Sequence, residues 1–223
     1  MTKASLTPAV LAEFVGTGVL VLAQVGTGVQ VFALTGNPGL TLLAIALVSG
    51  LALALGISVF GGISGGHFNP AVTLGLALTG NVKLTMILPY IIAQTAGAIG
   101  GAVLANVLWS DYAVSSAIGS TPSLQQLGSE IVATAGLVGL IVFMVRRGEG
   151  NKLGVLVPVW IATAILLTPT GSLANPAVTI GRVFTDSFAG VGSTSVFSFV
   201  GAQILAALLV AVIAWGAARN RAN

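Results

Sequence analysis

The pentapeptide Asn-Pro-Ala-Val-Thr occurs twice in this chain, at Asn69–Thr73 and at Asn175–Thr179, and this repeat decides the fold. Each copy opens an apolar stretch, N-P-A-V-T-x-G-x-x-x-T, that runs only as far as Thr79 or Thr185. At about 1.5 Å per helical residue such a stretch reaches ~16 Å, about half of a ~30 Å hydrocarbon core. Asn as N-cap with Pro at the first helical position predicts a helix start. The repeat therefore predicts two half-helices that meet head to head inside a membrane.

The composition places the rest of the chain in a lipid bilayer. Of its 223 residues 56% are hydrophobic and only 6% are charged, and the mean hydropathy is +1.05. A soluble domain carries about 25% charged residues. Cysteine is absent, which excludes a disulfide framework, a thiolate metal site and a cysteine nucleophile. No basic patch interleaved with aromatic residues is present, so we expect no nucleic-acid partner.

Six long apolar segments are predicted to cross the bilayer as helices. They cover residues 10–33, 40–60, 84–109, 127–145, 153–168 and 194–216. The fifth runs directly into the second Asn-Pro-Ala region, which makes its end the hardest to define. The N-terminus shows no cleavage pattern before the first segment, so that segment is interpreted as a retained span.

The basic residues predict an orientation with both termini in the cytoplasm, in a plasma or bacterial inner membrane. Positive residues gather on the cytoplasmic side of membrane proteins. With both termini inside, Asp111 and Asp186 lie outside, and Arg182 is the exception among the basic residues. The basic residues on the inner side are then Lys3, Lys83, Arg146, Arg147, Lys152, Arg219 and Arg221.

An internal repeat relates the two halves of the chain. The marks that recur in the same order are Glu13-x-Val15-x-Thr17 with Glu130-x-Val132-x-Thr134, the two half-helices, and Ala93-Gln94 with Ala202-Gln203. Each half holds three spans and one half-helix, and an odd number of spans forces the halves into opposite orientations. We expect one domain, 1–223, built as an inverted repeat of about 8–109 and 127–216, with its site near the midplane.

These features resemble the aquaporin or major intrinsic protein family. The resemblance covers nearly the whole chain and rests on Ala12-Glu13-Phe14, on Ser-Gly-Gly-His-Phe-Asn-Pro-Ala-Val-Thr at 64–73, on Glu130 and on the second Asn-Pro-Ala. It implies an all-α membrane protein: a right-handed bundle of six transmembrane helices and two re-entrant half-helices. It also implies a homotetramer with one pore in each protomer and no cofactor or metal.

The paired motif also predicts how such a pore excludes ions. Its residues are Asn69, Pro70, Ala71, Asn175, Pro176 and Ala177. Each helix N-terminus carries about +0.5 elementary charge, so two facing termini disfavour cations. The side-chain oxygens of Asn69 and Asn175 cap their own helices, and their amide nitrogens remain as donors toward the pore. A passing water offers its oxygen to both amide groups, so it cannot also relay a proton through that point. The alternative is that each Asn is only a helix cap.

Two intramembrane carboxylates and one histidine flank this motif. A carboxylate inside a membrane is energetically costly, so a functional role is the default hypothesis for Glu13 and Glu130. Their two interpretations are proton coupling, and acceptance of hydrogen bonds from the backbone of the re-entrant loops; the resemblance favours the second. His67 is either a pH-dependent gate or a loop histidine with a satisfied ring.

The resemblance also locates a selectivity filter, and this chain departs from it. Water-selective members narrow the pore with an aromatic residue, a histidine and an arginine, and the arginine directly follows the second Asn-Pro-Ala. Here the arginine position is Val178, and Thr179 follows it. Glycerol-conducting members usually keep the arginine, often followed by aspartate, so this pattern is not that of a standard glycerol channel either. The family spacing places the other three positions at Ser49, Thr163 and Ser172, and a shift of one residue replaces Ser49 with Val48 or Gly50. Such a ring predicts a wider filter that offers hydroxyl groups.

Arg182 lies four residues beyond Val178 and therefore on the same helical face. One interpretation places its guanidinium in an outer vestibule, one turn beyond the usual position. The other is an interfacial pair with Asp186 that faces loops or headgroups.

The chain is thus predicted to be a passive channel for water and small uncharged solutes such as glycerol, urea, ammonia, and arsenous or boric acid. One alternative is a water-selective aquaporin whose constriction is rebuilt from other residues. Another is an ion-coupled secondary transporter, which requires Glu13 or Glu130 to face the pathway. A membrane scaffold with a closed pore is a further alternative. An enzyme is not expected, because no metal-ligand cluster, nucleophile–base arrangement or phosphate loop is present.

Overall fold

The computed structural model describes residues 6–109 and 121–222 and is entirely helical in these ranges. Six of its helical segments are long and apolar enough to cross a membrane, which confirms the six predicted spans. The long helices are α1 (Leu6–Thr35), α2 (Pro38–Ser64), α4 (Ile87–Leu108), α5 (Leu124–Arg146), α6 (Leu153–Leu167) and α8 (Val196–Ala222). Short 3-10 turns precede three of them, at Leu84–Met86, Gly150–Lys152 and Ser193–Ser195.

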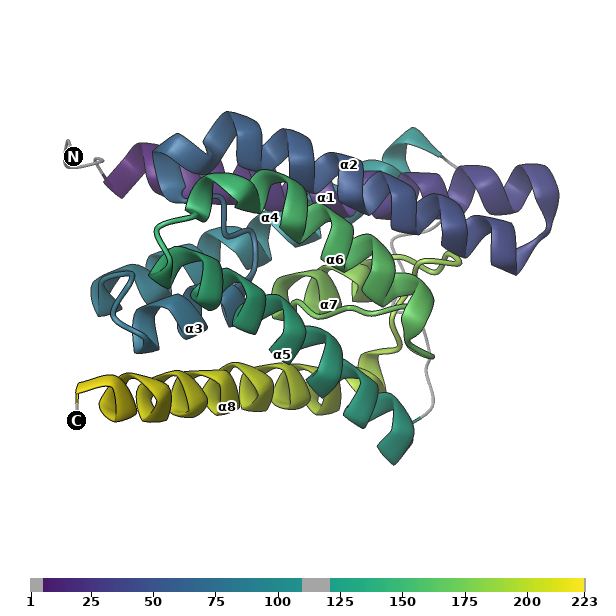
Figure 1. Cartoon of the computed structure of the whole chain (residues 1–223). Coiled ribbons are helices and arrows are strands. Elements are labelled where there is room, and N and C mark those ends of the chain that lie inside the picture. Colours follow the sequence, from purple (N-terminus) through teal and green to yellow (C-terminus); the bar gives the residue numbers. More distant parts are fainter. Residues whose placement is uncertain (1–5, 110–120, 223) are drawn as a thin grey trace.

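Two short helices, α3 (Pro70–Leu78) and α7 (Pro176–Gly181), begin at the repeated motifs. Figure 1 shows both in the middle of the bundle, with α1 and α2 on one side and α8 on the other. Helix α3 packs against α8 and α4, and α7 packs against α4 and α8. The half-helices are therefore enclosed by spanning helices, as the sequence predicts.

The second half-helix is shorter than predicted. The sequence repeat predicts a helix up to Thr185, but α7 ends at Gly181 and continues as the 3-10 turn Arg182–Phe184. Asn106 of α4 explains the early end, because its Nδ2 donates to the Phe184 carbonyl at 2.7 Å and its Oδ1 accepts from the Thr185 hydroxyl at 2.8 Å. These bonds hold Thr185 in an extended conformation, with φ −144°. In the first half the bonds of Thr79 are local: its hydroxyl donates to the Gly75 carbonyl at 2.7 Å and accepts from Asn81 Nδ2 at 2.9 Å.

Glycines bring α1 and α4 into close contact. A Cβ atom on Gly97 would lie 2.1 Å from the Phe14 carbonyl oxygen, and one on Gly101 would lie 2.2 Å from the Gly18 carbonyl oxygen. No side chain fits at either position, so backbone packs directly on backbone, as small residues allow between membrane helices. This contact places Glu13 of α1 next to Gln94 of α4.

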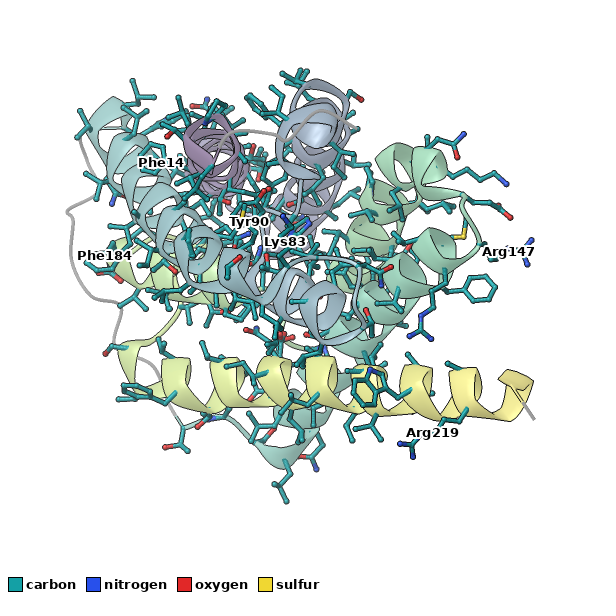
Figure 2. All side chains as sticks on the ribbon, turned by 90° about the vertical axis from the view of Figure 1, so that its left-hand side faces the viewer. Phe14, Lys83, Tyr90, Arg147, Phe184 and Arg219 are labelled. Carbon is teal, nitrogen blue, oxygen red and sulfur yellow. The ribbon has the colours of Figure 1, made fainter. Side chains whose placement is uncertain are left out.

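The outer surface of the bundle is apolar, as a lipid-facing surface requires. Large exposed side chains recur at helical spacing, for example Leu47, Leu51 and Leu55 on α2. Helix α1 begins and α8 ends at the same end of the bundle (Figure 1). Figure 2 looks at the bundle from this end, with Lys83, Arg147 and Arg219 labelled. Lys3, Asp111 and the side chain of Arg221 lie outside the described residues.

Candidate pore

The two asparagines cap the half-helices as predicted. Asn69 Oδ1 accepts from the Ala71 amide at 2.9 Å, and Asn175 Oδ1 accepts from the Ala177 amide at 3.0 Å. Pro70 and Pro176 occupy the first helical positions, where a missing N–H removes no hydrogen bond. Both prolines and both alanines are buried.

A loop precedes each half-helix: the first covers residues 65–69 and the second covers residues 168–175. The same two asparagines join these two loops to each other. Asn69 Nδ2 donates to the Ala174 carbonyl at 2.7 Å, and Asn175 Nδ2 donates to the Phe68 carbonyl at 2.8 Å. A side-chain amide has two N–H groups, so one of each pair links the loops and the second remains as a donor. Because Asn69 and Asn175 both line one cavity, these second N–H groups are the donors available at its midpoint.

The first loop is held by a buried carboxylate on α1. Glu13 is fully buried and accepts four hydrogen bonds. The donors are the Ser64 hydroxyl at 2.6 Å, the backbone amides of His67 at 2.9 Å and Phe68 at 2.6 Å, and Gln94 Nε2 at 2.7 Å. These bonds stabilise Phe68 at a positive φ of 48°, which turns its carbonyl toward Asn175.

The second loop is held in the same way by a carboxylate on α5. Glu130 is fully buried and accepts from a hydroxyl, two consecutive amides and a glutamine. The donors are the Thr170 hydroxyl at 2.6 Å, the amides of Leu173 at 2.9 Å and Ala174 at 2.8 Å, and Gln203 Nε2 at 2.8 Å. The two clusters use the same groups in the same order, the pattern expected of an inverted repeat. Neither carboxylate lines the cavity.

His67 lies in the first loop beside the cavity. Its Nδ1 is 3.0 Å from the Thr73 hydroxyl, and its ring packs edge-to-face on Tyr90 with centroids 5.3 Å apart. The Tyr90 hydroxyl in turn donates to the Ser64 carbonyl at 2.8 Å. The hydrogen bond ties His67 to α3, and the ring contact ties it to α4.

A cavity of ≈ 270 Å³ runs past the asparagine pair through the bundle. Polar side chains reach it from the two loops, from α1 and from the turn after α3: Gln24, Ser64, His67, Asn69, Asn81, Ser172 and Asn175. The rest of the wall is apolar, with Leu20, Leu53, Ile57, Val72, Leu76, Leu137, Ile141, Val145, Leu153, Val157, Ile161, Leu173 and Val178. The cavity wall is thus largely apolar, with polar groups at a few places.

The structure brings together only part of the predicted filter. Ser172 and Val178 line the cavity. Ser49 is buried behind it, where its hydroxyl accepts from Gln24 Nε2 at 3.0 Å. Thr163 does not line the cavity: its side chain is exposed on the outer face of α6, and its hydroxyl bonds the Val159 carbonyl.

The helical period explains why Thr163 faces outward. Val157 and Ile161 of α6 line the cavity, and they are four residues apart. Thr163 follows Ile161 by two residues, about 200° around a helix with 3.6 residues per turn. The chain between α6 and α7 is not helical. The number of residues between Thr163 and Asn175 therefore does not predict which face of α6 Thr163 lies on.

Gln24 and Asn81 are polar cavity residues that the sequence does not predict, and Gln24 is the one inside a spanning helix. It lies on α1 among apolar residues and is 4% exposed. A glutamine inside an apolar span is itself a signal, because an uncompensated polar side chain is costly there. The predicted filter positions are derived from their spacing to the two asparagines, and none of them lies on α1.

Arg182 lines a second, outer cavity of ≈ 510 Å³ with residues of the second loop such as Thr168, Thr170 and Gly171. Leu173 borders both cavities. The Arg182 Nε donates to the Ala189 carbonyl. Among the described residues Arg182 forms no ion pair with Asp186, whose side chain is exposed. The vestibule interpretation therefore fits the geometry, and the interfacial pair does not.

Spanning helices around two capped half-helices, with a cavity along their meeting point, define a membrane channel. Within the described ranges no cluster of three or more His, Asp or Glu residues is placed to hold a metal. Residues 1–172 match the family of the major intrinsic proteins. The chain belongs to this family: it is a multi-pass membrane protein and a channel for water and small solutes, not an enzyme.

Relatives across the family are similar over most of the chain. The aquaglyceroporin AqpS of Rhizobium meliloti is 37% identical over 96% of this chain and 92% of its own length. The propanediol uptake facilitator PduF of Salmonella typhimurium is 35% identical over 82% of this chain and 79% of its own. The structure of the aquaglyceroporin from Plasmodium falciparum superposes with a TM-score of 0.74 and 25% identity, over 93% of this chain and 94% of that one.

Proposed function

We propose that this channel passively conducts small uncharged solutes that carry hydroxyl groups, together with water, and excludes ions and protons at Asn69 and Asn175. The observation that carries the proposal is the cavity itself: a largely apolar wall, the N-termini of two half-helices at Asn69 and Asn175, and the uncharged Val178 shortly after the second asparagine. The printed names of two relatives, an aquaglyceroporin and a propanediol facilitator, point to the same solute class.

Ser172 and Val178 are the residues of the predicted filter that we retain. Ser49 contributes indirectly, through its bond to Gln24. A valine is smaller than an arginine and carries no charge, so the passage beside it is wider and less selective for water. Glycerol, urea, ammonia, and arsenous or boric acid are the solutes to compare.

Glu13 and Glu130 serve as anchors of the loops in this proposal. A coupling carboxylate in a secondary transporter must reach the pathway, whereas these two are fully buried and spend their oxygens on four donors each. Arg182 supplies a positive charge to the outer vestibule, which adds a second barrier to cations. We further propose that the basic end of the bundle is cytoplasmic and that the chain assembles as a homotetramer.

Stopped-flow light scattering on proteoliposomes tests this function. Vesicles with the protein should pass at least one of these solutes faster than empty vesicles, and a protonophore should not change the rate. Loss of solute flux on collapse of the proton gradient would identify a coupled transporter instead. Movement of water alone would identify a water-selective channel.

A further inference from the structure

Gln24 lies on the stretch of α1 between the asparagine pair and the outer vestibule. Eight residues before it, Gly16 lies directly against the Phe68 ring beside Asn69. Four residues after it, Gly28 packs on Ala189 and Ile45, and Ile45 borders the outer cavity. At ~1.5 Å per residue, Gln24 stands about 12 Å outward of Gly16. It therefore reaches the cavity on the outer side of its midpoint.

The hydrogen bonds around Ser49 determine which atom of Gln24 is left over. The Ser49 hydroxyl donates its one hydrogen to the Ile45 carbonyl at 2.6 Å, so it can only accept from Gln24. Gln24 must then present its Nε2 to Ser49, at 3.0 Å. Its Oε1 is buried and has no hydrogen-bond partner in the described part of the chain.

A second residue that lines the same cavity also carries an unpartnered oxygen. Ser172 is 3% exposed, and its Oγ also lacks a protein partner among the described residues. A hydroxyl both donates and accepts, whereas a carbonyl oxygen only accepts. Leaving such buried groups unpaired costs about 1–3 kcal/mol each. A solute with O–H groups recovers this cost, and Leu20, Ile161 and Val178 supply apolar surface for its carbon atoms.

We propose that Gln24 Oε1, positioned by Ser49, and Ser172 Oγ form a hydroxyl-binding subsite that favours polyols with neighbouring hydroxyl groups over water. The inference rests on the proposed function, because it specifies the solute that the outer part of the pore selects. Gln24 is then a specificity-determining residue contributed by α1, a helix outside the predicted filter ring.

Glycerol and water permeability of proteoliposomes, measured for wild type, Gln24→Leu and Ser172→Ala, tests this subsite. Loss of one hydrogen bond is worth about 1 kcal/mol, so each variant should lower glycerol permeability about five-fold. Water permeability should fall by a clearly smaller factor than glycerol permeability, and a Tm in detergent equal to that of wild type shows that the variants fold. Ser49→Ala should lower glycerol permeability in the same direction, because it releases Gln24. Gln30→Leu, the same change on the exposed face of α1, should leave both permeabilities unchanged.

The outcomes separate this inference from the proposed function. If wild type conducts no polyol or other hydroxylated solute, the proposed function fails and the subsite fails with it. If wild type conducts glycerol but Gln24→Leu and Ser172→Ala conduct it equally well, only the subsite is overturned. An equal loss of glycerol and water in both variants would also overturn it, because that pattern marks a structural role.

Discussion

Glu13 and Glu130 show how much of this fold depends on single residues. Each carboxylate satisfies two consecutive backbone amides in a loop that lies inside the membrane region, where no water replaces a missing partner. Each also bonds a glutamine from the last spanning helix of its own half, Gln94 or Gln203. Each loop conformation, including the positive φ of the residue before the asparagine, therefore depends on a carboxylate that accepts four hydrogen bonds.

Replacement of Glu13 with glutamine should destabilise the protein by at least about 2 kcal/mol. The NH2 group of the glutamine would face N–H and O–H donors of the loop and could not accept a hydrogen bond from them. Thermal unfolding in detergent should show a clear fall in Tm, and water permeability should fall with it. Asp186→Asn is the matched control, since the Asp186 side chain is exposed and forms no ion pair among the described residues. An unchanged Tm for Glu13→Gln would contradict the role of the carboxylate as loop anchor.

The sequence predicts the caps of the two half-helices, whereas only Ser172 and Val178 of the predicted filter line the cavity. Asn69 and Asn175 are identified because a repeated cap sequence determines its own local structure. Ser172 follows from its short distance to Asn175. The prediction that Thr163 lines the pore is wrong, and the position of Gln24 at the cavity is not predicted. Both depend on how a helix is rotated against its neighbours, which spacing along the chain does not encode.

At the scale of helices, the contact between α1 and α4 positions the Glu13 cluster. Gly101→Ala should lower the Tm, since the added Cβ would lie 2.2 Å from the Gly18 carbonyl oxygen and the helices would have to separate. A loss of about 1–3 kcal/mol is expected for such overpacking. Gly100→Ala, one residue earlier on the same helix, meets no atom within 4 Å and should leave the Tm unchanged. Equal Tm values for the two variants would show that the close approach contributes nothing.

The turn between α5 and α6 provides a prediction for pH. Hydrogen bonds from Lys152 at 2.5 Å and Arg147 at 2.8 Å lower the pKa of Glu149 below its usual value. A lowered pKa in the folded state stabilises the turn above the usual pKa, and this stabilisation is lost as pH falls through the lowered value. Amide exchange in residues 147–152 should be slower in wild type than in Glu149→Gln at pH 7. The difference should shrink as pH falls below the usual pKa of a glutamate; a difference that does not depend on pH would contradict this account.

The ends of the elements were harder to predict than their existence. The six spans follow from apolar length alone, and the two half-helices follow from their caps. The end of α7 did not, because Asn106 on α4 competes for the backbone at Phe184 and Thr185. A tertiary hydrogen bond of this kind has no counterpart in the local sequence.

For the whole molecule, the gathering of basic residues at one end predicts the orientation in the membrane. The chain contains no cysteine, so single cysteines report their side without background. In intact cells an impermeant maleimide should label Asp186→Cys but not Arg147→Cys, and permeabilisation should expose Arg147→Cys. The two positions lie at opposite ends of the pore, so each is the control for the other. The reverse labelling pattern would place the termini outside.

The central claim is that this pore is wide enough for hydroxylated solutes because Val178 replaces a cation beside the asparagine pair. Glycerol and water permeability of wild type and Val178→Arg, compared in the same proteoliposomes, tests it most directly. Wild type should conduct both, and Val178→Arg should lower glycerol permeability about ten-fold, an increase of ~1.4 kcal/mol in the barrier, while water still passes. If wild type conducts only water, or if Val178→Arg leaves the ratio of glycerol to water permeability unchanged, the claim is contradicted.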